Sequence, residues 1–174
     1  MLVTDGAGRC DASLAQAAVD FIQIREPGLS VRALAGCVRD LTIKGGPRIL
    51  VNDRSDVAIA CGAGGVHLRD RSVSPAVIRR IAPTGFIVTV ACHDVASVFR
   101  AEGEGADYAV VAPIFAPLSK PLGWPPLGLD ALRAIASRTK IPVIALGGIT
   151  TENAALCVEA GAAGVAGITL FQRR

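Results

Sequence analysis

The stretch Gly105-Ala106-Asp107-Tyr108-Ala109-Val110-Val111-Ala112 joins a glycine of the kind that ends helices to an apolar run of strand length. The same join recurs two strand-and-helix units away on either side, at Gly62-Ala63-Gly64-Gly65-Val66 and Gly161-Ala162-Ala163-Gly164-Val165. A chain that repeats this join alternates strands with helices. That alternation is typical of a parallel sheet covered by helices.

Eight apolar runs of strand length follow one another along the chain, and longer segments with helical periodicity separate them. In one such segment Val31, Leu34, Val38 and Leu41 share a helical face. The runs predicted as strands are Met1-Leu2-Val3-Thr4, Asp20-Phe21-Ile22-Gln23-Ile24-Arg25, Arg48-Ile49-Leu50-Val51-Asn52, Gly65-Val66-His67-Leu68, Phe86-Ile87-Val88-Thr89-Val90-Ala91, Tyr108-Ala109-Val110-Val111-Ala112, Pro142-Val143-Ile144-Ala145-Leu146 and Gly164-Val165-Ala166-Gly167-Ile168-Thr169.

Eight strands and about seven helices favour an α/β fold of the (β/α)8 TIM-barrel type. The barrel is small, because typical ones have ~250 residues and this chain has 174. Since the chain stops just after the eighth strand, we expect a single domain over residues 1–174 that lacks the last helix. An open doubly wound sheet of five or six strands is the alternative, and it would turn two of the runs into loops.

Composition narrows the functional classes. The net charge of +3 is spread along the chain, without a basic block beyond Arg173 and Arg174, so we expect no nucleic-acid partner. The longest charge-free stretch has 13 residues, 160–172, whereas a membrane-spanning helix needs ~20. No secretory leader is recognisable in Met1-Leu2-Val3-Thr4-Asp5. These features predict a cytoplasmic protein without a membrane partner.

In a barrel of this type, the active site lies at the C-terminal ends of the strands. Polar or glycine residues stand there after most of the predicted strands, and their convergence is the main indication of a site. The candidates are Asp5, Gln23, Arg25, Asn52, Asp53, His67, Arg69, His93, Asp94, Ser119, Lys120, Gly147, Gly148 and the segment Gly167-Ile168-Thr169.

A phosphate site is predicted at the last two strand ends. Gly147-Gly148 follows the seventh strand and is expected to lead into a helix, where backbone N–H groups can approach a phosphate. The eighth strand ends in Gly167-Ile168-Thr169, and barrels commonly share a phosphate between these two loops. The alternative is that the glycine pair is only a tight turn.

His93 is the first choice for an acid or base, because an imidazole at the end of the fifth strand can move protons near pH 7. His67, on the fourth strand, has equal chances of facing the barrel interior as a core residue. Asn52-Asp53 could hold magnesium, but Asp53 could equally cap the following helix, so no metal site is predicted.

Several segments together resemble the thiamine-phosphate synthase / TenI superfamily of small phosphate-binding barrels, over essentially the whole chain. They are Gln23-Ile24-Arg25-Glu26, Val51-Asn52-Asp53-Arg54-Ser55-Asp56-Val57-Ala58, Gly65-Val66-His67-Leu68, Ala106-Asp107-Tyr108, Ala112-Pro113-Ile114-Phe115, Ser119-Lys120-Pro121 and Ile144-Ala145-Leu146-Gly147-Gly148-Ile149.

The chain departs from the synthases, which join a pyrimidine pyrophosphate to a thiazole phosphate with magnesium. Pro27 stands where they have a lysine, Ser72 where they have a metal-binding aspartate, Ala91 where they have a serine and Pro117 where they have a threonine. The resemblance is therefore closer to the TenI-like thiazole tautomerases, which lack much of the pyrophosphate equipment. It implies an isomerase that aromatises a thiazole carboxylate phosphate without an external cofactor.

In that interpretation His93 is the acid and base, and Lys120 or Arg25 neutralises the substrate carboxylate. Gln23 and Asn52 complete the substrate site, and Gly147, Gly148, Gly167, Ile168 and Thr169 bind the phosphate. Two alternatives stay open: a thiamine-phosphate synthase, which would need magnesium, and a non-catalytic protein that binds thiazole phosphate. The surface left by the absent helix makes a homodimer possible.

Overall fold

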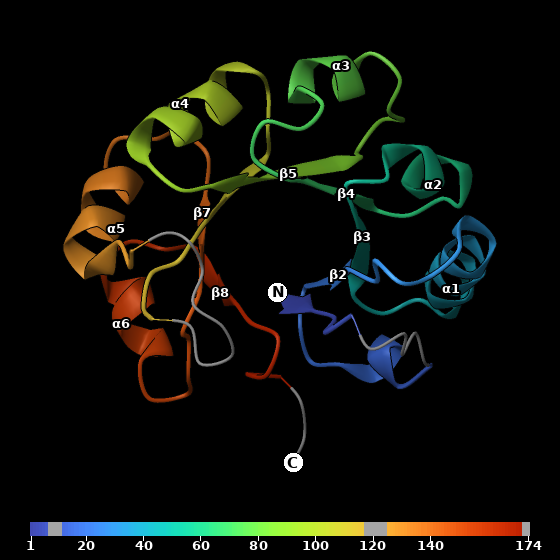
Figure 1. The fold of residues 1–174 in the computed structure, drawn as a ribbon, viewed down its shortest axis with the longest axis horizontal. Coiled ribbons are helices and arrows are strands. Elements are labelled where there is room, and N and C mark those ends of the chain that lie inside the picture. The colour runs from blue at the N-terminus through green and yellow to red at the C-terminus, as the bar shows by residue number, and fades with distance from the viewer. Residues whose placement is uncertain (7–11, 117–124, 172–174) are drawn as a thin grey trace.

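The computed structural model describes residues 1–6, 12–116 and 125–171. Its eight strands form one parallel sheet in the order of the sequence, and Figure 1 shows them as a ring inside a layer of helices. Leu2 pairs with Gly167, which joins the last strand to the first. The strands are β1 (Leu2–Val3), β2 (Phe21–Ile24), β3 (Arg48–Asn52), β4 (Gly65–Leu68), β5 (Ile87–Cys92), β6 (Tyr108–Val111), β7 (Val143–Leu146) and β8 (Gly164–Ala166).

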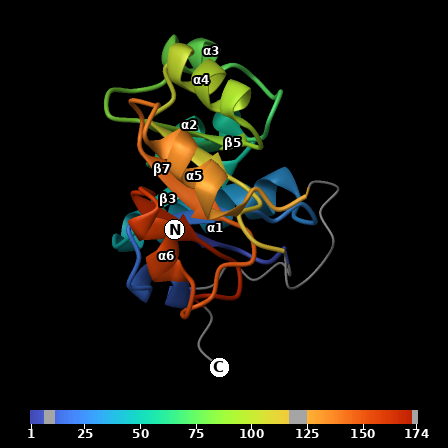
Figure 2. The same cartoon turned by 90° about the vertical axis from the view of Figure 1, so that its left-hand side faces the viewer.

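The predicted (β/α)8 barrel is thereby confirmed, and all eight apolar runs contain a strand. Among the described residues no helix follows β8, as expected. The helices are η1 (Ala12–Gln16), α1 (Val31–Lys44), α2 (Ser55–Ala60), α3 (Pro75–Arg79), α4 (Val95–Gly103), α5 (Gly128–Ala136) and α6 (Ala154–Glu159). In Figures 1 and 2, α3 and α4 lie on the side of the barrel away from α6.

Two apolar layers hold the barrel together. Residues that point outward from the strands, such as Val66 and Val88, pack against the helices in the larger cluster. Residues that point inward, such as Leu50, Ile87 and Val110, fill the barrel itself. Because side chains alternate along a strand, each strand serves both layers. None of the helices in the described part of the chain is long and apolar enough to cross a membrane.

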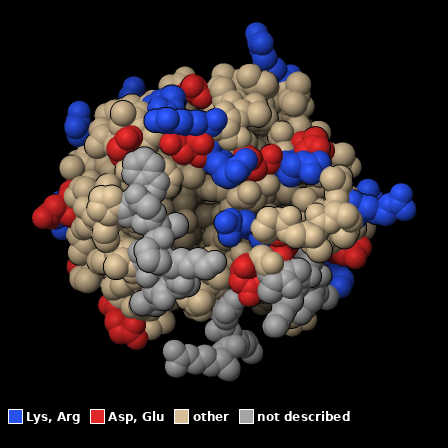
Figure 3. Space-filling model, viewed as in Figure 1, with Lys and Arg blue, Asp and Glu red and all other residues tan. Residues whose placement is uncertain are grey.

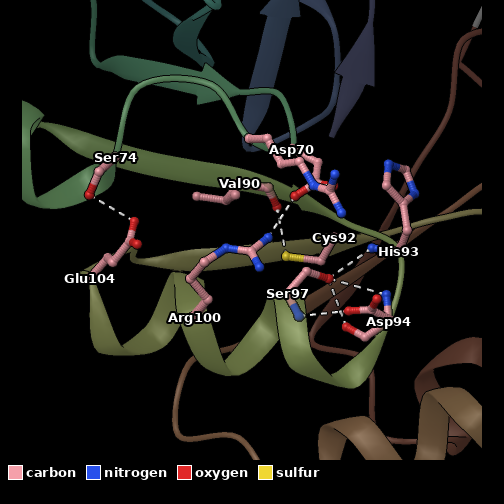
Figure 4. A network of polar contacts seen from close by, with 10 residues as sticks. Asp70, Ser74, Val90, Cys92, His93, Asp94, Ser97, Arg100 and Glu104 are labelled. Carbon is pink, nitrogen blue, oxygen red and sulfur yellow. Dashed lines mark hydrogen bonds and ion pairs between the residues drawn. The ribbon is translucent and has the colours of Figure 1, made fainter.

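Local sequence explains where the helices begin. The Ser74 hydroxyl accepts a hydrogen bond from the Ala76 N–H, with Pro75 at the first helical position of α3. At α4, the Asp94 carboxylate accepts a hydrogen bond from Ser97 N, and the Ser97 hydroxyl oxygen accepts one from Asp94 N. This reciprocal pair is a capping box. Figure 4 shows this cap directly after β5. It fixes the strand end that carries His93.

Candidate active site

The C-terminal ends of the strands meet on a hollowed face of the barrel. In Figure 3, basic and acidic side chains alternate along the upper rim of this hollow. The ion pairs Arg69–Asp53, Arg100–Asp70 and Arg54–Asp56 come from the segments that follow β3, β4 and β5. We call this face the mouth of the barrel.

A layer of polar side chains closes the barrel interior below the mouth. Gln23 on β2 donates from Nε2 to Asn52 Oδ1 on β3 at 2.8 Å. On the next strands, His67 Nδ1 lies 2.8 Å from Thr89 Oγ1. Asn52 is in register with His67, and His67 with Thr89, so the four side chains cross four adjacent strands. Amide, imidazole and hydroxyl groups therefore line this level of the barrel interior on β2 to β5.

The structure resolves the orientation of His67, which faces the interior. Burial lowers the pKa of His67 to about 4, while the nearby Asp53 carboxylate raises it and the nearby Arg25 guanidinium lowers it. The ring is therefore neutral at pH 7. Its partner Thr89 was missed by sequence reasoning, although inward alternation with Ile87 could have identified it.

His93 stands at the end of β5, with its ring directed away from the cap of α4 (Figure 4). Its Nδ1 lies 2.6 Å from the Ala112 carbonyl oxygen, which can only accept. Nδ1 therefore carries a proton in this contact. This geometry suits a group that accepts and returns a proton.

The neighbouring Cys92 has a different environment. It is fully buried, and burial raises the pKa of its thiol to about 12. A thiolate does not form there near neutral pH, so Cys92 offers no nucleophile.

Asp53 lies at the centre of a compact cluster after β3. Its backbone has a left-handed φ of 57°. One carboxylate oxygen, Oδ2, contacts Arg69 Nε at 2.7 Å and Nη2 at 2.5 Å, and Oδ1 accepts from the Ser72 hydroxyl at 2.5 Å. Burial raises the pKa of Asp53, but hydrogen bonds from Ser72 and Arg69 outweigh it and hold the pKa below its usual value. Asp53 does not cap α2, whose N-cap is Arg54.

These contacts bear on magnesium, which the resemblance attaches to synthase activity. Both oxygens of Asp53 are already bound, and Asp70 pairs with Arg100 at 2.7 Å. Within the described residues, no group of three or more His, Cys, Asp or Glu side chains could hold a metal ion. A magnesium ion would have to displace a guanidinium from a carboxylate, so this arrangement does not fit the metal.

The predicted phosphate segment has a different local structure from the one expected. Helix α6 begins only at Ala154, so Gly147-Gly148 does not stand at a helix N-terminus as the sequence suggested. The reason is Asn153, whose side chain donates to Gly148 O at 2.9 Å and accepts from Thr150 N at 2.8 Å, which stabilises an intervening loop.

The glycine pair itself is required by the backbone. Gly147 and Gly148 have φ values of 98° and 62°, and a Cβ on Gly148 would lie 2.4 Å from Ala116 O. Their carbonyl oxygens accept from Phe115 N and from Asn153, respectively. Neither of their N–H groups donates to another described residue. The turn is tight, and its amides are available to an anion.

The remaining predicted residues are distributed over the mouth. Gly167 uses both backbone groups to close the barrel, accepting from Val3 N and donating to Met1 O, so its N–H is taken. Ile168 is partly buried and Thr169 is exposed beside it. Arg25 is exposed after β2, and its N–H donates to Thr4 Oγ1 at 2.8 Å. Lys120 lies outside the described residues.

The fold and the mouth together define the class of small (β/α)8 barrels with polar groups at the strand ends. Residues 5–171 match the TMP-TENI family model, described as thiamine monophosphate synthase, and the chain belongs to this family. It is 42% identical to the thiamine-phosphate synthase of Methanoculleus marisnigri, over 97% of this chain and 84% of the relative. It is 43% identical to the putative thiamine-phosphate synthase 2 of Aquifex aeolicus, over 88% of this chain and 83% of that protein.

A solved structure agrees with this assignment. The thiamine phosphate pyrophosphorylase of Pyrococcus furiosus superposes with a TM-score of 0.81 at 29% identity, covering 97% of this chain and 84% of that one. The similar proteins carry the synthase name, which favours thiamine-phosphate synthase, predicted above as an alternative, over the tautomerase.

Proposed function

We propose that this protein is a thiamine-phosphate synthase, which joins a pyrimidine pyrophosphate to a thiazole phosphate and releases pyrophosphate. The observation that carries the proposal is the similarity to named synthases at about 40% identity over nearly the whole chain. Membership of the family supports a role in thiamine biosynthesis, with a phosphorylated thiazole and a phosphorylated pyrimidine as the substrates.

The mouth offers groups for both substrates. The amides of Gly147 and Gly148 would bind the thiazole phosphate, since their N–H groups have no partner among the described residues. The paired Gln23 and Asn52 amides supply donors and acceptors for the ring nitrogens of a heterocycle. Arg25, exposed beside them, supplies positive charge for an anionic substituent.

A second candidate is a TenI-like thiazole tautomerase, and two observations favour it. Asp53 is bound by Arg69 and Ser72 in place of a metal, and Pro27 and Ala91 stand where the synthases have a lysine and a serine. In this reaction His93 would remove one proton from the thiazole and deliver another, which its Nδ1 contact to Ala112 prepares.

Two assays on the purified protein separate these candidates. One measures thiamine phosphate formed from the pyrimidine pyrophosphate and the thiazole phosphate, and the other measures isomerisation of the thiazole carboxylate phosphate. Turnover in the first assay supports the synthase. Turnover in the second alone assigns the tautomerase, and binding of thiazole phosphate without either turnover assigns the non-catalytic role.

A further inference from the structure

The Arg69 guanidinium contacts a single described side chain at the mouth, the Asp53 carboxylate. Its Nε and Nη2 both contact Asp53 Oδ2, and the Asp53 carboxylate is in turn held by the Ser72 hydroxyl. The Asp53 side chain is 15% exposed, whereas the Arg69 side chain is 72% exposed. Asp53, which anchors the pair, is therefore mostly buried, whereas Arg69 is exposed to solvent.

This geometry leaves several N–H donors of the Arg69 guanidinium without a partner among the described residues. A guanidinium has five N–H groups in a fixed plane, and Asp53 occupies two of its nitrogens through one N–H each. The other guanidinium N–H groups make no contact with a described residue, and the side chain as a whole is 72% exposed. Two parallel N–H groups of this kind match two oxygens of a phosphate, which is why arginine is common at phosphate sites.

The position of this cation is also informative. Arg69 follows β4 directly, and its anchor Asp53 and the exposed Arg25 both act on the pKa of His67, the β4 residue of the polar layer. Arg25 follows β2 and Arg69 follows β4, so both arginines stand at the C-terminal ends of strands, on the mouth of the barrel. The carboxylate next to them is neutralised by its pairing, so the local charge favours an anion.

We propose that Arg69, anchored by Asp53 and Ser72, takes the place of a divalent cation and binds the pyrophosphate group of the pyrimidine substrate directly. The inference rests on the proposed synthase function, because it names the group that carries the pyrophosphate. It also accounts for the poor fit of the Asp53 cluster to magnesium: the charge that a metal would supply is already there as a guanidinium.

Calorimetric titration of the full chain with inorganic pyrophosphate tests the proposal without relying on turnover. We expect pyrophosphate to bind in the presence of a chelator, with little change on adding magnesium. Arg69→Gln should weaken this binding about tenfold or more, because it removes a charge-assisted pair of hydrogen bonds. Since Arg69 is largely exposed, the variant should unfold at nearly the wild-type temperature.

Arg71→Gln is the matched control. It removes the same charge two residues away, from a side chain that is 86% exposed and 3.8 Å from Asp70. We expect it to change pyrophosphate affinity less than twofold, on the order of a surface charge effect. The proposal is overturned if wild type binds pyrophosphate only with magnesium, if it binds none, or if the two variants behave alike. Failure to form thiamine phosphate would instead refute the synthase function, which pyrophosphate titration does not measure.

Discussion

At the scale of single residues, two histidines that look alike in sequence have different environments in the structure. His93 is partly exposed at a strand end with Nδ1 on a carbonyl, whereas His67 is buried and paired with Thr89. Alternation along β4 left both orientations of His67 open in the sequence. The choice depends on the register of β4 with β5, a property of the assembled sheet.

For the tautomerase candidate, His93→Asn should slow isomerisation of the thiazole carboxylate phosphate about 10²-fold or more, the scale of a lost general acid or base. Thiamine-phosphate formation and phosphate binding should change by no more than about twofold, because the substitution removes only the ring that would accept and return the proton. Steady-state kinetics of both reactions provide the comparison. Equal isomerisation by variant and wild type, or none by wild type, would remove His93 from this role.

His67 should make stability depend on pH. The pKa of His67 is about 4 in the folded protein and about 6.5 when unfolded. The unfolded chain therefore binds more protons between these values, so the free energy of unfolding falls as pH drops from about 6.5 to about 4. The full effect is on the order of 3 kcal/mol.

Urea unfolding at pH 7 and pH 5 measures this dependence. His67→Asn should be less stable than wild type at pH 7 because it loses the contact with Thr89, and its stability should change less between the two pH values. An equal pH dependence in both proteins would show that other groups control it.

At the scale of elements, strand positions followed from the apolar runs, but the loops between them did not. The segment after Gly148 was expected to be helical, whereas Asn153 stabilises a loop and delays α6 to Ala154. The Asp53 cluster was equally hidden, because it requires left-handed conformations at Asp53 and Arg71 that non-glycine residues seldom adopt. Sequence reasoning therefore found most residues of the mouth, but it missed Thr89 and Ser72 and did not predict the pairing of the side chains.

The phosphate assignment belongs to the loops after β7 and β8. Substituting Gly148 would be a poor test, because a Cβ there would lie 2.4 Å from Ala116 O. Thr169→Asp instead adds negative charge at an exposed position after β8. It should weaken thiazole phosphate binding about tenfold or more through repulsion, as measured by calorimetry.

Ser137→Asp is the control for this charge, because Ser137 is exposed at the C-terminal end of α5, the end of the helix that leads back to the start of β7. It should leave the affinity for thiazole phosphate unchanged. Comparable affinities of wild type and Thr169→Asp would place the phosphate elsewhere at the mouth.

At the scale of the whole molecule, the barrel was predictable because its two apolar layers impose a period on every strand. The activity was not predictable, because a synthase and a tautomerase would share this barrel and differ in a few side chains. Pro27 and Ser72 favoured the tautomerase, and the similarity to named synthases favours the other reaction. Homodimer formation stays a prediction that sedimentation velocity tests.

Formation of thiamine phosphate is the most direct test of the account. Purified protein is incubated with the pyrimidine pyrophosphate and the thiazole phosphate, and thiamine phosphate and released pyrophosphate are quantified over time. We predict equal amounts of both products, in many-fold excess over enzyme, with the reaction persisting in a chelator and slowed in Arg69→Gln. No thiamine phosphate from folded protein that binds the thiazole phosphate would contradict the synthase function.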